Sequence, residues 1–232
     1  TITKAYPDDT ITADDIAVIT GTSDPFDVVP AGLHSLEVIE QPDETTAGET
    51  IGPVTVNATD EYGNVISGLD ITVTEITYSY TFDSGNLTQT TGSNGIATFN
   101  NLVIETANTD YQLEFANGGV YTDSNTFDVV PAKLASLEVI DQPGKTTAGD
   151  AIGPVTVLAE DEYDNVISGL GISVTEVGHS YPFNSGTLTQ TTDGDGIATF
   201  DNLVINTANT GYQLHFANSG VTTDSNTFDV VP

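Results

Sequence analysis

The amino-acid sequence predicts an all-β protein built from two tandem β-sandwiches. Thr, Val, Ile, Asp, Asn and Gly dominate, and no long stretch has the mixture of Leu, Ala, Glu and Lys that is typical of stable helices. The second observation is an internal repeat: Phe-Asp-Val-Val-Pro at residues 26–30 recurs at 127–131 and at 228–232, a period of 101 residues. This period predicts one sandwich over residues 31–131 and another over 132–232, arranged end to end.

Within each repeat, short runs of alternating apolar and polar residues are separated by turn residues, as expected for a sandwich of short strands. In repeat one, residues 54–59 read Val-Thr-Val-Asn-Ala-Thr, which places three apolar side chains on one face of a half-buried strand. The sequence Asp-Glu-Tyr-Gly-Asn at 60–64 then predicts a hairpin to a strand at 71–73, with Gly63 or Asn64 tolerating a positive φ.

A second hairpin is expected at residues 92–95, where Gly-Ser-Asn-Gly separates strands at 87–90 and 96–99. Residues 111–115 alternate in the same way as the earlier strands, with Tyr, Leu and Phe on one face. The predicted core of repeat one collects the inward-facing apolar residues of these strands: Leu36, Val38, Val54, Val56, Val73, Phe99, Tyr111, Leu113, Phe115 and Phe127.

The two repeats are joined through Val130-Pro131-Ala132, without a Gly- or Ser-rich linker. Proline fixes its own φ and biases the residue before it towards extended conformations. We therefore expect a short and fairly stiff joint, so that the array is a rod rather than a flexible string of domains.

The charge balance is strongly acidic: 34 Asp and Glu stand against 3 Lys and Arg, a formal net charge of -31. Nucleic acid and anionic lipid are poor partners for such a chain, because binding to phosphate needs Lys and Arg. The longest apolar runs are only a few residues, far below the roughly 20 that cross a bilayer, so no membrane insertion is expected. Salt or divalent cations are the expected partners of this charge.

Two acidic clusters are candidate Ca²⁺ sites. The first is Asp60 with Glu61, which recurs in repeat two as Asp161 with Glu162. The second is the turn at residues 193–195, where Asp193 and Asp195 offer oxygen ligands at alternate positions, as in Ca²⁺ loops. The alternatives are a solvated acidic loop in the first case and aspartate in a tight turn in the second. We expect that no cofactor is required, and Ca²⁺ is the candidate metal ion.

Neither a catalytic site nor a cysteine-based site is expected. The chain has no cysteine, and its three histidines, His34, His179 and His215, are each replaced by another residue in the other repeat. No nucleophile elbow or metalloprotease helix accompanies them, so the sequence predicts a protein without enzymatic activity. The triplets that begin at Asn57 and Asn86 match the acceptor pattern for N-linked glycans, although a chain rich in Asn and Thr also produces such triplets by chance.

The order of motifs resembles the bacterial immunoglobulin-like repeats of large prokaryotic surface proteins, a group that includes the stalk domains of invasin and intimin. The motifs that carry the resemblance occur in both repeats: Gln41-Pro42 and Gln142-Pro143, Thr-Thr-Ala-Gly at 45–48 and 146–149, residues 60–64 and 161–165, Asn- or Asp-Gly-Ile-Ala-Thr-Phe at 94–99 and 195–200, and Tyr-Gln-Leu at 111–113 and 212–214. The resemblance implies an extracellular stalk that holds an adhesive or sensory end away from the cell surface.

Residues 1–30 contain only the end of a repeat. Residues 23–30 match the last strand of a repeat, and residues 16–18 are a candidate for part of the strand before it. Two strands with an apolar face are not stable alone in water. We therefore expect this segment to be the terminal strands of a preceding repeat, to pack on the first sandwich, or to donate a strand to another subunit.

These interpretations leave three functions open. The first is a structural spacer in the rigid stalk of a cell-surface protein or adhesin. The second is a subunit of an extracellular filament or appendage, joined by β-strand donation through residues 1–30. The third is a binding module that recognises a glycan or a protein with loops at one end of a sandwich.

Overall fold

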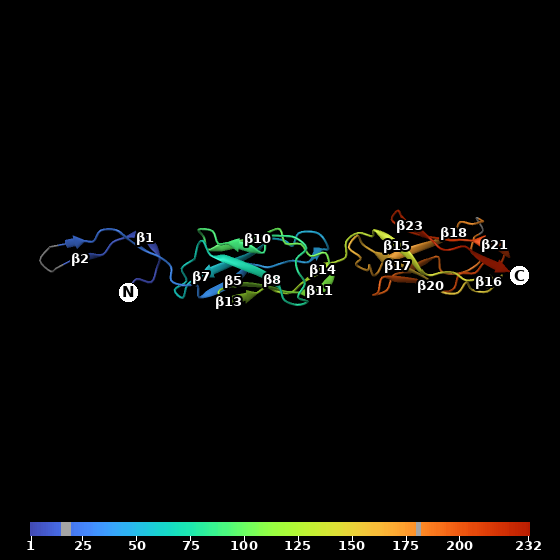
Figure 1. The fold of residues 1–232 in the computed structure, drawn as a ribbon, viewed down its shortest axis with the longest axis horizontal. Helices are drawn as coiled ribbons and strands as arrows, with labels where there is room; N and C mark the ends of the chain where they lie inside the picture. The colour runs from blue at the N-terminus through green and yellow to red at the C-terminus, as the bar shows by residue number, and fades with distance from the viewer. Residues whose placement is uncertain (15–19, 180–181) are drawn as a thin grey trace. The chain divides into compact units, whose positions relative to one another are not determined.

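The computed structural model describes residues 1–14, 20–179 and 182–232, and all of its regular structure is β-strand (Figure 1). The chain divides between Val130 and Pro131 into two units, each of which contains one complete sandwich. The all-β fold and the two sandwiches predicted from the sequence are confirmed. None of the described residues belongs to a helix that is long and apolar enough to cross a membrane.

Repeat one is built from three small sheets. Two of them are antiparallel, in the strand orders β10-β7-β5 and β13-β12-β8-β9, and the third has the order β11-β14-β6, with β6 parallel to β14. The strands are β5 (Ser35–Glu40), β6 (Thr45–Thr46), β7 (Val54–Thr59), β8 (Asp70–Glu75), β9 (Thr88–Thr90), β10 (Ile96–Phe99), β11 (Asn108–Tyr111), β12 (Leu113–Asn117), β13 (Val120–Asp123) and β14 (Phe127–Val130).

Repeat two has the same three sheets, in the strand orders β15-β17-β20, β19-β18-β22-β23 and β16-β24-β21. Its strands are β15 (Ser136–Asp141), β16 (Thr146–Thr147), β17 (Val155–Glu160), β18 (Gly171–Glu176), β19 (Thr189–Thr191), β20 (Ile197–Phe200), β21 (Asn209–Tyr212), β22 (Leu214–Asn218), β23 (Val221–Asp224) and β24 (Phe228–Val231). The 101-residue period in the sequence is therefore a period in the fold.

The core of repeat one lies between the sheets, where the sequence predicts it. Of the predicted core residues only Val38 is half-buried, and the others are buried. Phe99 of β10 packs on Phe115 of β12 with their ring centroids 5.1 Å apart, which joins the two larger sheets. Further residues on the loops and strands, absent from the predicted core, are also buried, among them Ala47, Ile51, Ile71, Ala97, Leu102, Ile104 and Val129.

The two hairpins predicted from the sequence are wrong. β7 pairs with β5 and β10, whereas β8 pairs with β12 and β9, so the loop at residues 60–69 crosses from one sheet to the other. The turn at residues 92–95 likewise connects β9 and β10, which lie in different sheets. Gly63 does adopt a positive φ of 77°, as expected. Both sheets bury one face against the same core, so the alternation of side chains does not reveal which sheet a strand joins.

The run at residues 111–115 also changes sheet. Tyr111 at the end of β11 is paired with Phe127, whereas Leu113 at the start of β12 is paired with Glu75. The Tyr111 hydroxyl donates a hydrogen bond of 2.8 Å to the carbonyl oxygen of Thr106, five residues upstream. Tyr212 makes the equivalent bond to Thr207 in repeat two. Such a tyrosine corner is a hallmark of the immunoglobulin fold.

Gly196 marks a tight contact at the crossing between the sheets of repeat two. Its φ is +72°, and a Cβ built there would lie 2.8 Å from Val166 Cβ. We expect Gly196→Ala to lower the free energy of unfolding of repeat two by about 2–3 kcal/mol, because a left-handed backbone and a steric clash act together. Urea denaturation measures the change. Gly194→Ala is the control, since nothing lies within 4 Å of its added methyl group; equal losses in the two variants would contradict the prediction.

The described part of residues 1–30, which is 1–14 and 20–30, contains four short strands: β1 (Tyr6–Asp9), β2 (Thr12–Asp14), β3 (Thr20–Thr22) and β4 (Phe26–Val28). β1 pairs with β4, and β2 pairs with β3, both antiparallel. The sequence therefore underestimates the number of strands in this segment. The candidate strand at residues 16–18 lies outside the described residues.

Candidate functional site

The loop that follows β7 is built around a buried aspartate. Asp60 is only 2% exposed, and its Oδ1 accepts hydrogen bonds from the backbone N–H groups of Tyr62 (2.9 Å) and Asn64 (2.8 Å). Its Oδ2 accepts one from Asn64 Nδ2 (2.8 Å) and one from the backbone N–H of Ala31 (2.9 Å). Ala31 follows Pro30, so the carboxylate ties the beginning of the repeat to this loop. We call residues 60–64 the clasp of repeat one.

Asn64 extends the clasp to the N-terminal segment. Its Nδ2 also donates to the carbonyl oxygen of Thr3 (2.8 Å), and its Oδ1 accepts a hydrogen bond from the backbone N–H of Ala5 (3.0 Å). The ammonium group of Lys4 lies 3.3 Å from the carbonyl oxygen of Tyr62. Both protons of the Asn64 amide and its carbonyl oxygen are therefore used. The clasp holds residues 3–5 on one side and the carboxylate of Asp60 on the other.

Repeat two has the same clasp, formed by residues 161–165. The Oδ1 of Asp161 accepts hydrogen bonds from the backbone N–H groups of Tyr163 (2.8 Å) and Asn165 (2.9 Å). Its Oδ2 accepts bonds from Asn165 Nδ2 (2.9 Å) and from the backbone N–H of Ala132 (2.7 Å). Asp164 replaces Gly63 at the turn and keeps a φ of 64°, a conformation that aspartate tolerates better than most residues.

The hydrogen bonds of the clasps stabilise the ionised carboxylates. Burial of the Asp60 carboxylate opposes ionisation, but the bonds from the Asn64 side chain and from the backbone N–H groups of Ala31, Asn64 and Tyr62 outweigh it and lower its pKa to about 2. The pKa of Asp161 is lowered by the equivalent donors, again against the effect of burial. The pKa of the neighbouring Glu160 is raised by burial and by the charges of Asp164, Glu138 and Asp161.

These shifts predict a loss of stability in acid. The folded pKa of Asp60 lies below its ordinary value of 3.8, so the stability that the clasp of repeat one contributes is complete above about pH 4 and is lost as the pH falls through about 2. The lowered pKa of Asp161 gives repeat two a pH dependence of the same sign. We expect the melting temperature to fall more steeply between pH 4 and 2 in the wild type than in the double variant Asp60→Asn/Asp161→Asn. Calorimetry at pH 2–5 measures both slopes, and parallel slopes would rule out this role for the clasps.

The candidate Ca²⁺ ligands do not come together in one cluster. Each carboxylate oxygen of Asp60 and Asp161 already accepts two N–H donors, which a cation would have to replace. Glu61 and Glu162 are exposed. Asp193 Oδ1 accepts the backbone N–H groups of Asp195 and Ile197, each at 3.0 Å, which stabilises the turn. Among the described residues, no group of three or more His, Asp or Glu side chains is placed to hold a metal ion. Ca²⁺ binding stays a prediction.

The charge imbalance predicts that cations stabilise the protein. We expect millimolar Ca²⁺ or molar NaCl to raise the melting temperature, because either one reduces the repulsion within a chain of net charge -31. Calorimetry with Ca²⁺ and with NaCl at the same ionic strength separates specific binding from screening, and Asp193→Asn/Asp195→Asn tests the turn. Melting temperatures that respond to neither addition would refute the expectation.

The two candidate glycosylation residues have different surroundings. Asn57 lies in β7, between its partners Glu37 of β5 and Ile96 of β10, and is half-buried. Asn86 is exposed in the loop before β9, where its backbone N–H donates to Asn101 Oδ1 (3.0 Å). Asn86 is therefore the more accessible acceptor. Both sites stay predictions.

The three histidines lie in different surroundings in the part of the chain that the structure describes. His34 is exposed, next to β5. His215 Nδ1 lies 2.6 Å from Asp224 Oδ1 on the neighbouring strand β23. His179 Nε2 lies 2.7 Å from the carbonyl oxygen of Thr210, and its ring packs edge-on against Tyr212. Each contact is a local one within a sandwich.

Comparison with solved structures shows a similarity of fold. InvD of Yersinia pseudotuberculosis is 20% identical to this chain with a TM-score of 0.52, and the match covers 83% of this chain and 57% of the InvD structure. The fold is that of the bacterial immunoglobulin-like repeats. Invasin is 17% identical with a TM-score of 0.39, covering 84% of this chain and 39% of its own. The D0-D1 domains of intimin are 15% identical with a TM-score of 0.33, covering 87% of this chain and 100% of their own.

No model of a protein family matches the sequence, and no curated protein matches it. At the identities found, the structural similarity establishes the fold of the immunoglobulin-like repeats and nothing more. The resemblance predicted from the motifs is confirmed to that extent.

Proposed function

We propose that the chain is an extracellular spacer, part of the stalk of a bacterial cell-surface protein. The observation that carries the proposal is the clasp: the Asp60 carboxylate binds the backbone N–H of Ala31, and Asn64 binds the backbone of Thr3 and Ala5. A stalk has to hold its far end at a defined distance, so the chain that enters each sandwich must have a restrained conformation. Asp161 binds Ala132 in the same way at the beginning of repeat two.

The composition and fold agree with this function. Hydrogen bonds to a carboxylate are stronger than bonds between neutral groups. Three such bonds fix the Asp60 carboxylate within its loop, and the fourth, from Ala31, adds a restraint on the entering chain to that of Pro30. The clasp uses only main-chain donors and one amide side chain, and it needs neither a cofactor nor a disulfide. The net charge of -31 favours a solvated molecule that does not bind other acidic surfaces.

Spin labels can test the stiffness that the proposal requires. The chain has no cysteine, so Thr22→Cys and Tyr121→Cys, both at exposed positions, give a single pair of labelling sites in the first unit. We expect a narrow distribution of distances between the labels, which Asn64→Ala broadens. Asn94→Ala is the control, since Asn94 Oδ1 accepts a bond from the backbone N–H of Ile96, two residues away within repeat one. A broad distribution in the protein with an intact clasp would count against the spacer function.

A filament joined by strand donation is the second candidate. The exposed apolar side chains of the N-terminal segment, Ile2 at 48% and Ile11 at 57%, favour it because they suit a partner strand. Electron microscopy of the purified protein distinguishes particles of fixed length from open polymers. Recognition of a glycan or protein by the end loops stays a hypothesis from the sequence.

A further inference from the structure

The four strands of the N-terminal segment repeat the last four strands of a sandwich. β1 and β4 pair with Tyr6 opposite Val28 and Asp9 opposite Phe26, and β11 and β14 pair with the same spacing and the same irregularity, Asn108 opposite Val129 and Tyr111 opposite Phe127. Asp8 and Asp110 occupy equivalent positions, with φ of 57° and 58°. The backbone N–H of each donates to an aspartate on the paired strand, Asp27 (3.1 Å) and Asp128 (2.9 Å).

The second strand pair of the segment follows the same plan. The backbone N–H of Ser23 donates to the carbonyl oxygen of Ile11 (3.0 Å), and the N–H of Ile11 donates to Ser23 Oγ (3.0 Å). In repeat one, Ser124 and Leu113 exchange the same two bonds at 2.8 and 3.0 Å. β1, β2, β3 and β4 therefore correspond to β11, β12, β13 and β14.

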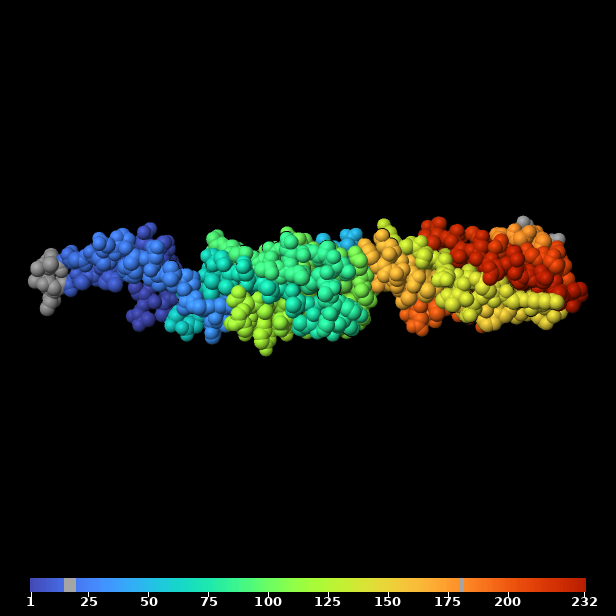
Figure 2. All heavy atoms as spheres, in the orientation of Figure 1, coloured from blue at the N-terminus to red at the C-terminus, as the bar shows by residue number. Residues whose placement is uncertain are grey.

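The segment differs from repeat one in what covers its apolar residues. Ile11 is 57% exposed, whereas its counterpart Leu113 is fully buried. Phe26 and Val28 are half-buried, whereas Phe127 and Val129 are buried. In Figure 2 the segment, coloured blue, is thinner than the adjoining body of repeat one, as expected for part of a sandwich.

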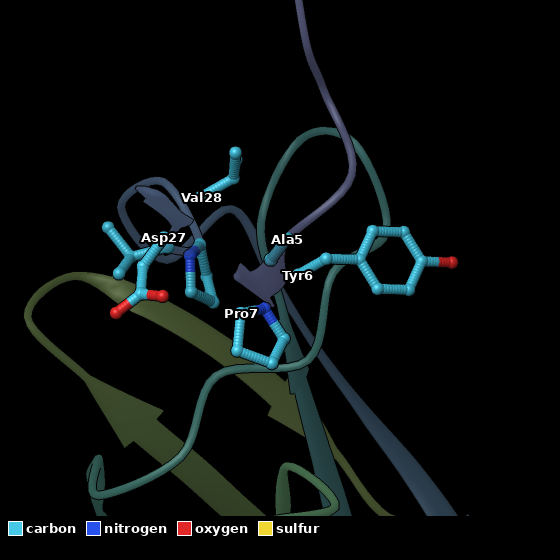
Figure 3. A pocket seen from close by; sticks show the side chains of 7 residues that line it. Ala5, Tyr6, Pro7, Asp27 and Val28 are labelled. Carbon is cyan, nitrogen blue, oxygen red and sulfur yellow. The ribbon is translucent and has the colours of Figure 1, made fainter. Parts of the chain in front are cut away.

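The strands of the segment also have fewer partner strands, among the described residues, than their counterparts in repeat one. In repeat one, β14 pairs with β6 and β12 pairs with β8, whereas β4 and β2 each have only one partner strand among the described residues. A groove lies along β4 and is lined by residues 5–7 and 27–30. In Figure 3 the ring of Tyr6 points away from Asp27 and Val28 of β4. Val129 and Val130, the counterparts of Val28 and Val29, pair with Thr45 and Thr46 of β6. The groove thus adjoins the edge that a strand like β6 covers in a complete sandwich.

We infer that β1 to β4 are the last four strands of a third sandwich, and that their open apolar face binds a segment with the sequence pattern of residues 31–102. In repeat one this stretch contains β5 to β10, which cover the equivalent strands. A second copy of the chain fits less well, because its own residues 31–102 already pack against its own β11 to β14. It would have to open a folded sandwich before it could bind.

A chain extended at its N-terminus tests the inference. A second copy of residues 31–102 is joined directly ahead of Thr1. The pairing of β1 with β4 matches that of β11 with β14 and aligns Thr1 with Val103, so the added copy ends where the segment begins. We expect backbone amides at 6–14 and 20–28 to exchange hydrogen at least about 100-fold more slowly than in the original chain. The matched control carries Val54→Asp and Val56→Asp in the added copy only, because both residues are fully buried in repeat one.

Hydrogen exchange and sedimentation together distinguish binding of the added segment from binding of a second copy of the chain. Ile11→Asp is expected to leave the original chain unchanged and to unfold the third sandwich of the extended chain, as a charge buried in its core would. Sedimentation of the original chain across a range of concentrations detects a second copy. The inference is overturned if amides 6–14 and 20–28 exchange equally fast in the chain with the intact extension and in the chain with the Asp-containing extension. Aggregation of both extended chains would overturn it too, as would self-association of the original chain that protects β1 to β4 from exchange.

Discussion

Phe115→Ala is expected to lower the free energy of unfolding of repeat one by about 3–5 kcal/mol. Phe115 is fully buried in β12, and its ring packs on Phe99 of the opposite sheet at a centroid distance of 5.1 Å. The substitution removes apolar area from the core and leaves a cavity between two sheets that cannot move together without breaking their own hydrogen bonds. Urea denaturation followed by hydrogen exchange of repeat one measures the change.

The neighbouring strand provides a matched control for this prediction. Tyr121 in β13 is also aromatic, but 65% of it is exposed. Tyr121→Ala is expected to change the free energy of unfolding by less than about 0.5–1 kcal/mol. If both variants lost the same stability, the sandwich would not be held by the core that the structure shows.

Asp161→Ala is expected to destabilise repeat two by about 2–4 kcal/mol. The substitution leaves the backbone N–H groups of Ala132, Tyr163 and Asn165 without the acceptor that they use in the folded state. These groups lie beside a side chain that is 2% exposed, so water compensates for the lost carboxylate only in part. Thermal and urea unfolding of the full chain, read through hydrogen exchange in residues 136–160, measure the effect.

Two variants separate the hydrogen bonds of Asp161 from its charge. Glu162→Ala removes one negative charge from the exposed neighbour and is expected to change stability by at most about 0.5 kcal/mol. Asp161→Asn keeps one acceptor oxygen but places an NH₂ group against N–H donors, so we expect a loss close to that of Asp161→Ala. An Asp161→Asn variant as stable as the wild type would show that the clasp is not held by the ionised carboxylate.

Much of the fold can be predicted from the sequence because the relevant signals are local. The alternation of Val54, Val56 and Ala58 with polar residues identifies a strand and its buried face without reference to any other strand. The 101-residue period identifies the two sandwiches, since each copy must bury its own apolar faces. The core residues follow from these two observations, and the structure buries nearly all of them.

The two hairpins predicted wrongly involve residues whose partners are distant in the sequence. Residues 60–64 contain the Asp, Gly and Asn of a hairpin, and sequence alone cannot distinguish this turn from a crossing between sheets. The sequence contains one signal of the clasp: Asp60 is followed four residues later by Asn64, and Ala31 follows a proline. It is a weak one, because the Ala31 N–H reaches Asp60 from 29 residues away.

The sequence by itself determined that this protein is all β, repeated and strongly acidic, and which strand residues form the centre of its core. Only the tertiary structure decided which sheet each strand joins, what the buried aspartates bind, and that four strands of the N-terminal segment match the end of a repeat. The physical reason is that periodicity is a property of one strand. Pairing and the satisfaction of a buried charge depend on groups that only folding brings together.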